Sequence, residues 1–327
     1  MVALKLEPAK NVDDLELYRH FRARGFPTLL FLAPDGAELD RFDDFMPPDD
    51  FLATINRIKE GDTFATRLAR LDEDAGNFAL LELVYEGLMV REDFPQVFAR
   101  IAAFRAANPD LEPDPSTGLL QKTYMRQHSW LYWGAGSSYR NNWEGEIPEI
   151  QEPLAAPSLM ALLEENLPEM PKTEQAERIR QARSDDAAMI LEMTAGLDLP
   201  PDLLFANAGF AFDNGLCDLA AGFYNEWFDA VEGPHPGNLN QAAWNLYLCR
   251  RDLEQAITIV RAAYALDSGP SVADTLAQLL YVTGSIDEAI EIEQKAAAED
   301  EEYAEVVKRM KAGEDMIRRP PFDSYPE

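Results

Sequence analysis

The sequence predicts a mainly α-helical protein that begins with a small α/β segment and continues as an α-α superhelix of stacked helical pairs. Two observations indicate this division. An apolar run from Thr28 to Leu32, bounded by Phe26-Pro27 and by Pro34-Asp35-Gly36, is typical of a short buried strand. After about residue 60, apolar residues recur at helical spacing in paired segments, and the last pairs repeat with a shift of 33 residues.

The first 60 residues carry the pattern of a small mixed sheet. Residues 2–6 alternate as a strand, residues 12–24 have apolar side chains near helical spacing, and residues 37–42 form the second arm of a hairpin. We expect Asp49 or Asp50 to cap a closing helix, whose apolar face is formed by Phe51, Leu52, Ile55 and Ile58.

Together with the step Gly25-Phe26-Pro27-Thr28, this order resembles the second half of a thioredoxin fold, over about residues 2–60. The resemblance implies a cis bond before Pro27 and a backbone edge at Phe26, Pro27 and Thr28 that pairs with an extended peptide. The alternative is that the proline only shapes the loop. In this family the redox dithiol Cys-x-x-Cys lies upstream of the matched region, so we transfer no thiol-disulfide catalysis to this chain.

The resemblance also raises a difficulty with strand pairing. In the family, the strands matched by residues 2–6 and 28–32 flank a central strand that is not among the matched residues. Exposed central edges invite pairing with other chains. We therefore expect the segment to close up, to borrow a strand, or to be a truncated fragment, and we favour truncation or a misassigned start.

The clearest internal repeat lies near the end of the chain. The segment Asp252–Ile257 is echoed by Ser285–Ile290, and apolar helices at 243–248 and 274–281 precede them. This unit resembles the tetratricopeptide repeat, a helical hairpin of about 34 residues. In such repeats small residues let paired helices approach, and larger ones fill the space between hairpins. The packing positions expected here are Trp244, Tyr247, Ala256, Ala263, Leu276, Ala277, Leu280, Gly284, Ala289 and Ala296.

Looser helical hairpins are predicted at 78–107 and 203–231, with turns near Glu92-Asp93 and at Asn214-Gly215. Two further helices, 158–183 and 185–197, are expected to be separated by a cap at Arg183-Ser184-Asp185. We expect four segments: a partial thioredoxin-like domain at 1–60, a helical region at 61–200 with an aromatic insertion at 119–150, tetratricopeptide-like repeats at 201–317, and a loose tail at 318–327.

The aromatic insertion surrounds a glycine-serine stretch, residues 134–138, that we interpret as a turn. Such a cluster can stack a ligand, and the stretch can cradle a phosphate, although no lysine follows the glycines as a P-loop requires. The alternative, which we favour, is that the aromatic side chains pack the insertion against the repeats. These side chains are Trp130, Tyr132, Trp133, Tyr139 and Trp143.

The chain has 29 basic and 59 acidic residues, a formal net charge of −30. Such a field repels phosphate backbones, so nucleic acid and anionic membranes are not expected partners. The negative surface serves either solubility and salt adaptation or the docking of a basic partner. No stretch approaches the roughly 18 apolar residues of a membrane span, and no signal peptide is visible. We expect a cytoplasmic protein, or an exported one if an upstream signal precedes the printed start.

Cysteine and histidine residues give no sign of a reactive site. Cys217 and Cys249 each lie among helical apolar residues, so we expect two buried small hydrophobic side chains, with a disulfide as the alternative. His20, His128 and His235 are far apart and are expected to be surface or packed residues. We name no catalytic, cofactor-binding or metal-binding residue.

Two functions are compatible with these patterns. The first, which we favour, is a non-catalytic interaction protein whose carboxylate-rich concave face binds a protein or peptide, with a basic or extended peptide as one option. The second is a thiol-disulfide oxidoreductase of the thioredoxin family, whose Cys-x-x-Cys part would lie upstream of Met1.

Overall fold

The computed structural model describes residues 16–17, 20–21, 28–43, 47–141, 156–163 and 171–316, with only the backbone described at 43, 130, 133–141 and 163. The chain forms two compact units, Met1–Thr123 and Tyr124–Glu327, which are treated separately below. The predicted domain boundaries after residues 60 and 200 remain predictions. The predicted strand at 2–6, most of the helix at 12–24, the bond before Pro27 and residues 318–327 lie outside the described residues.

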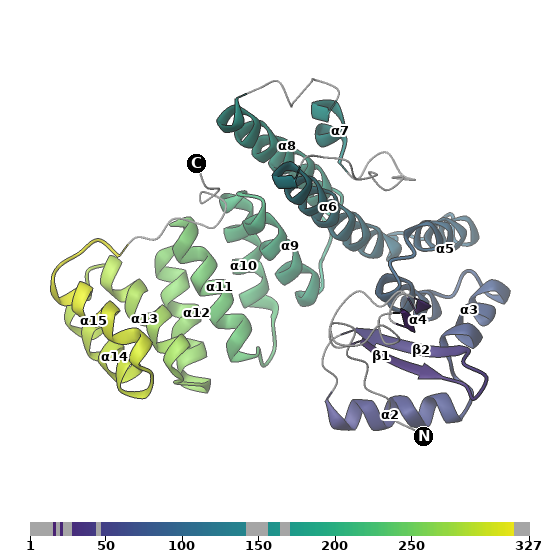
Figure 1. Ribbon diagram of the computed structural model, residues 1–327, viewed down its shortest axis with the longest axis horizontal. Coiled ribbons are helices and arrows are strands. Elements are labelled where there is room, and N and C mark those ends of the chain that lie inside the picture. The colour runs from purple at the N-terminus through teal and green to yellow at the C-terminus, as the bar shows by residue number, and fades with distance from the viewer. Residues whose placement is uncertain are drawn as a thin grey trace. The chain divides into compact units, whose positions relative to one another are not determined.

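The first unit contains the predicted hairpin. Strand β1 (Thr28–Leu32) pairs antiparallel with β2 (Glu38–Asp43), with Leu30 opposite Arg41 (Figure 1). The turn between them closes at Gly36, whose φ of +88° lies in the region where glycine has no steric penalty. The hairpin is thus confirmed, whereas the thioredoxin-like arrangement around it stays a prediction.

Helix α2 (Pro48–Lys59) follows the hairpin, but neither Asp49 nor Asp50 caps it. The N-cap residue is Pro47, which makes no side-chain capping hydrogen bond, and Pro48 occupies the first turn. A proline there is preorganised for the helix, so the helix begins before the two carboxylates. They lie in the first turn instead, where the helix dipole favours negative charge.

Ion pairs link β2 to neighbouring helices. Glu38 bridges Arg41 and Arg91, and Asp40 pairs with Arg57 of α2, each at 2.6 Å. The Arg91 guanidinium also lies 3.8 Å from the ring centroid of Phe64. Partial burial would raise the pKa of Glu38, but the two arginines outweigh it and lower that pKa.

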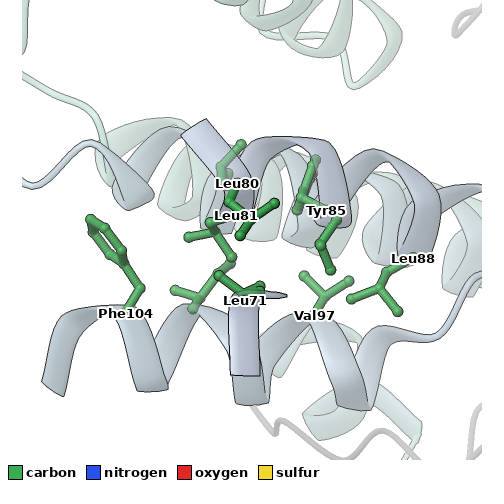
Figure 2. Close-up of a cluster of buried hydrophobic side chains, with 10 residues drawn as sticks. Leu71, Leu80, Leu81, Tyr85, Leu88, Val97 and Phe104 are labelled. Carbon is green, nitrogen blue, oxygen red and sulfur yellow. The ribbon is translucent and has the colours of Figure 1, made fainter. Parts of the chain in front are cut away.

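The remaining helices of this unit are α3 (Phe64–Glu73), α4 (Phe78–Val90) and α5 (Phe94–Ala107). The predicted hairpin at 78–107 is therefore confirmed as α4 and α5. Figure 2 shows the core between them, with side chains of α4 facing those of α5 and with Leu71 of α3 beside both. Its most buried members include Leu81, Val84, Leu88, Val97 and Phe104.

Helix α6 (Ser116–Asn141) corrects the prediction of a glycine-rich turn. The backbone of residues 134–138 is helical. A glycine in a helix costs only about 1 kcal/mol relative to alanine, and no proline occurs between Ser116 and Asn141, so nothing in this stretch forces the helix to end.

Helix α7 (Pro157–Leu163) and α8 (Lys172–Glu192) bring a second correction. Helix α8 runs without a break through Arg183-Ser184-Asp185, where the sequence had suggested a cap. The neighbouring Asp186 is fully buried and caps another helix: its carboxylate accepts from the backbone N–H of Ser158 at 2.8 Å and of Leu159 at 3.1 Å. The tertiary fold therefore supplies the acceptor for the start of α7.

The rest of the second unit is a stack of helical hairpins (Figure 1, teal to yellow). They are α9 (Pro201–Asp213) with α10 (Cys217–Ala230), α11 (Pro236–Cys249) with α12 (Leu253–Leu266), and α13 (Pro270–Val282) with α14 (Ile286–Glu299). A short 3-10 turn, η2 (Glu301–Tyr303), and α15 (Ala304–Lys311) follow. The fold is mainly α with tetratricopeptide-like helical repeats, as predicted.

Small residues occupy the helix contacts of these repeats. Ala256, Ala263, Ala277 and Ala289 have no exposed surface, and Ala296 is 2% exposed. Larger residues at expected packing positions are also buried: Tyr247, Leu276 and Leu280. A methyl side chain at such a contact lets two helix axes approach closely, which is why alanines recur there.

Four helical hairpins have the same type of turn between their two helices. The backbone N–H groups of Asp93, Leu216, Arg251 and Ser285 each donate to the carbonyl five residues earlier. This is the Schellman bond that satisfies a carbonyl at a helix end, and it requires a left-handed residue just before the donor. That residue is Glu92, Gly215, Arg250 or Gly284, with φ of +50°, +76°, +53° and +96°.

The two cysteines form a disulfide, which corrects the expectation of two free buried side chains. Cys217 is the first residue of α10 and Cys249 is the last residue of α11, and their Cα atoms are 5.4 Å apart. Their separation of 32 residues is close to the repeat period, so stacking of successive hairpins brings the two positions together. In the described part of the chain, no helix is both long and apolar enough to cross a membrane.

Candidate functional site

A cavity of about 510 Å³ opens on the first helices of the last two hairpins. Helices α11 and α13 form two of its walls, and η2 with the start of α15 forms the third. The cavity lies within the second unit. The residues that give it its chemistry are Asn240, Trp244, Ser271, Asp274, Glu302 and Tyr303.

Helical spacing places these side chains on one side of each helix. On α11 the lining positions are 237, 240, 241 and 244, and on α13 they are 271, 274 and 275. Residues three, four and seven positions apart share a helix face. The intervening residues, such as Leu239, Ala243 and Ala273, are buried in the core of the stack, so packing of that core turns the polar face toward the cavity.

Asp274 is held in place by a buried neighbour. Its Oδ1 accepts a hydrogen bond of 2.7 Å from Nε2 of Gln278, one turn further along α13. Gln278 has no exposed surface, and its Oε1 lies 3.3 Å from the Tyr247 hydroxyl on α11. The carboxylate is therefore positioned by a chain of side chains that joins the two helices.

The cavity is electronegative. Partial burial, together with the carboxylates of Asp274, Asp300, Glu293 and Glu302, raises the pKa of Tyr303. Four carboxylates acting on one phenol favour the uncharged hydroxyl, and the same field favours a cation brought beside it.

Two aromatic rings border these charges. Trp244 is partly buried and packs on Tyr247, with ring centroids 5.2 Å apart and planes tilted by 37°. Tyr303 is partly buried on the other wall. An aromatic face beside a carboxylate suits a guanidinium or ammonium group, which stacks on the ring while it pairs with the acid.

Asn240 adds a polar group with unused capacity. Its Nδ2 lies 3.4 Å from Oγ of Ser271 and links α11 to α13. Its Oδ1 is buried and makes no hydrogen bond with any described residue. Buried amide oxygens are usually satisfied, so this unpartnered oxygen is unusual for a residue at the cavity wall.

A second cluster of polar residues, around α6 and α8, is structural. His128 and Asp186 have no exposed surface, and the Tyr132 hydroxyl donates to Asp186 at 2.5 Å. Burial and the charge of Arg183 lower the pKa of His128 to about 3, so its ring is neutral. The prediction that His128 is a packed residue is therefore confirmed.

The peptide-binding edge predicted at Phe26, Pro27 and Thr28 lies mostly outside the described residues. Phe26 and Pro27 lie outside the described residues, and Thr28 begins β1, where it pairs with Asp43. The proposed pairing of this edge with a peptide stays a prediction. Of the expected packing positions, Trp244 lines the cavity, and Gly284 forms the turn between α13 and α14.

Sequence reasoning did not single out Asp274, Glu302 or Tyr303. The available signal was polar residues at 240, 271 and 274, on the side of each helix away from its apolar positions. Such a face is usually only a solvated one. The third wall gave no signal, because η2 and α15 come from an acidic stretch outside the two clear repeat copies.

No family model matches this chain, and no curated protein matches it. Among solved structures, the chain is similar to one described as "Structure of Naa15/Naa10 bound to HypK-THB". The match has 13% sequence identity and a TM-score of 0.29, and it covers 78% of this chain and 49% of that one. This chain thus spans about half the length of the chain it matches. A TM-score this low does not identify a shared fold.

Proposed function

We propose that this protein is a non-catalytic interaction protein that binds a basic, extended segment of a partner protein in the cavity between α11, α13 and α15. The observation that carries the proposal is the convergence of Asp274 and Glu302 with the rings of Trp244 and Tyr303 in one cavity. Carboxylates next to aromatic faces select arginine or lysine side chains.

The shape of the site supports an extended ligand. Stacked helical hairpins expose the same helix of each pair along one surface, so successive hairpins present successive contacts. The bond between Asn240 and Ser271 spans two such helices, so a ligand that lies along it contacts both hairpins. The net charge of −30 would attract a basic partner over a longer range.

A phage-displayed random nonapeptide library tests the proposal. We expect selection on the full chain to enrich arginine and lysine, and selected peptides, measured by fluorescence anisotropy, to bind more weakly as salt increases. Asp274→Asn combined with Glu302→Gln should weaken binding at least tenfold. Asp287→Asn, an exposed acid in the first turn of α14, is the matched control and should leave affinity within twofold.

Two results would overturn the proposal: no enrichment of basic residues, or selected peptides that bind the Asp274 and Glu302 double variant as well as they bind the parent. Thermal unfolding of each variant separates loss of binding from loss of folding. The oxidoreductase alternative is not proposed, because its Cys-x-x-Cys is not among the residues of the printed sequence and no described residue supports it.

A further inference from the structure

The first helices of the three hairpins share one register. Each begins with a proline, which is Pro201 in α9, Pro236 in α11 and Pro270 in α13. In each hairpin the left-handed residue of the turn follows that proline at the same distance along the chain, at Gly215, Arg250 and Gly284. Helix α9 lies against α11, as α11 lies against α13 (Figure 1). Positions counted from the proline are therefore equivalent in the three helices.

The side of the stack that lines the cavity continues onto α9 with different chemistry. On α11 the lining positions lie one, four, five and eight residues after the proline, and α13 contributes the first three of these. Where the cavity has the polar side chains of Asn240 and Asp274, α9 has an aromatic ring, and where it has Trp244, α9 has a glycine. The equivalent residues of α9 are Asp202, Phe205, Ala206 and Gly209.

Phe205 is the outer member of a fixed aromatic cluster. Its ring centroid lies 4.8 Å from that of Trp227 and 5.8 Å from that of Tyr224, both on α10. Trp227 is 3% exposed and Tyr224 has no exposed surface, whereas Phe205 is only partly buried. The Tyr224 hydroxyl accepts a hydrogen bond of 2.7 Å from Nδ2 of Asn245, which ties α10 to α11. Phe205 therefore offers a rigid apolar surface.

Gly209 leaves room on the same face of α9. It follows Phe205 by four residues, so the two positions are neighbours on the helix surface. Outside its own helix, and among the described residues, an added Cβ at Gly209 would have one atom within 4 Å, the Tyr224 hydroxyl oxygen at 3.9 Å. Ala206 carries only a methyl group and is partly exposed. These three positions together give apolar contact and space for a side chain of a ligand.

The distance between neighbouring first helices matches one turn of polyproline II. Packed helices have axes about 8–10 Å apart. Polyproline II has three residues per turn and rises about 3.1 Å per residue, so side chains three positions apart point the same way and lie about 9 Å apart. In a β-strand, side chains on one face lie two or four positions apart, about 7 or 13 Å, and neither distance matches one step of the stack.

We propose that Phe205, Ala206 and Gly209 form a second subsite for the partner segment, and that this subsite takes an apolar side chain three residues away from the arginine or lysine in the cavity. The inference rests on the proposed function, because the cavity fixes the basic residue and thereby the register. The segment crosses the first helices in a polyproline II conformation. Burial of the apolar side chain adds affinity that salt does not screen.

The peptide library tests this register. On the full chain we expect aliphatic or aromatic residues to be enriched three positions from the basic residue. Replacing that apolar residue by alanine in a selected peptide should weaken binding about fivefold or more, as measured by fluorescence anisotropy. Apolar enrichment at two or four positions, or none at all, would overturn the inference.

Two variants fill the subsite. Gly209→Gln and Ala206→Gln each place a longer polar side chain on this face, and glutamine is a better helix former than the glycine it replaces. Each should weaken the selected peptide about fivefold and leave the affinity of its alanine derivative within about twofold. If both variants bind the two peptides as the parent does, the inference is wrong.

Gly222→Gln is the matched control. Gly222 is an exposed glycine within α10, and an added Cβ there would meet no described residue within 4 Å. It lies two positions from the buried Tyr224, which places it on the other side of that helix. The control should bind the selected peptide as the parent does. Thermal unfolding of each variant separates loss of binding from loss of folding.

The variants also separate this inference from the proposed function. If Asp274→Asn with Glu302→Gln weakens binding while the filled variants and the alanine peptide do not, the cavity binds its basic residue without a subsite on α9, and the inference is overturned. If the filled variants weaken binding while that double variant does not, the apolar subsite stands and the proposed role of the cavity is overturned.

Discussion

Arg250 occupies the position at the end of α11 that Gly284 occupies, one hairpin later, after α13. Both residues are left-handed, with φ of +53° and +96°, and each precedes a residue whose N–H closes the same bond to a carbonyl five positions back. Glycine adopts this conformation freely, whereas a side chain adds a clash of about 1 kcal/mol. One repeat thus has the residue that the turn requires and its neighbour does not.

Replacing Arg250 by glycine should raise the free energy of unfolding by about 1 kcal/mol, because the strain of the left-handed side chain is removed. Gly284→Ala should lower it by a similar amount. A Cβ at Gly284 would meet no atom of the rest of the chain within 4 Å, so that loss would come from the local left-handed backbone and not from packing. Urea unfolding followed by circular dichroism measures both. Changes of the same sign in the two variants would contradict the prediction.

The Cys217–Cys249 bond should stabilise the stack of hairpins. Closing a loop of this length in the unfolded chain is worth about 3–4 kcal/mol in the chain-entropy description. The Cys217→Ser, Cys249→Ser double variant should lose stability in that range. A reducing agent should destabilise the parent and leave the double variant unchanged. Two reactive thiols in the native, unreduced protein would contradict the bond. Such bonds persist in oxidising compartments. The compartment of this protein stays a prediction.

Asp186 should be among the most sensitive positions of the second unit. Its carboxylate is fully buried and accepts from two backbone N–H groups of α7 and from the Tyr132 hydroxyl. Asp186→Ala leaves three buried donors without an acceptor, which should cost about 3 kcal/mol or more. The exposed neighbour Asp185 provides the control, and Asp185→Ala should stay within about 0.5 kcal/mol. Equal losses in thermal unfolding would show that burial of Asp186 is not the cause.

His128 should make the protein less stable in acid. Burial and then the charge of Arg183 lower its pKa from the usual 6.5 to about 3. Between these two values the unfolded chain binds a proton on His128 that the folded chain does not, so stability falls as the pH drops. The loss from this one group is about 3 kcal/mol between pH 7 and pH 4.

Other groups also titrate in this range, so the measurement is a comparison. The free energy of unfolding of the parent and of His128→Gln is measured at pH 7 and at pH 4. The free energy of unfolding of the variant should fall by about 3 kcal/mol less over that interval. Any packing cost of the substitution is the same at both pH values and cancels. An identical loss in both chains would place the His128 pKa near its unfolded value.

The fold was largely predictable from local patterns. The hairpin at 28–43 and the helix pairs at 78–107, 203–231 and 243–299 follow from periodicity and turn residues, since each forms from contacts close in sequence. The predictions were wrong where residues that often end a helix occur inside one. Ser184-Asp185 in α8 resembled a break in that helix, whereas the Ser184 hydroxyl donates to the carbonyl of Asn214 and the next residue, Asp186, caps α7. The glycines after Trp133 resembled a turn inside what is a continuous helix.

The candidate site was less predictable. Trp244 was recognised as a repeat position, yet its partners Glu302 and Tyr303 come from a segment without a repeat signature. Their approach depends on how α15 folds back on α13, through contacts such as that between Tyr281 and Met310. The periodicity of the sequence does not predict this packing of α15 on α13.

By itself, the sequence determined that this chain is mainly helical, that its hairpins repeat about every 33 residues, and that its charge is strongly negative. These properties follow from composition and from contacts between residues close in the chain. Only the tertiary structure decided which carboxylates and rings share a cavity and that Cys217 meets Cys249. Both depend on the stacking of separate hairpins, because residues about 30 positions apart become neighbours only when one hairpin packs on the next.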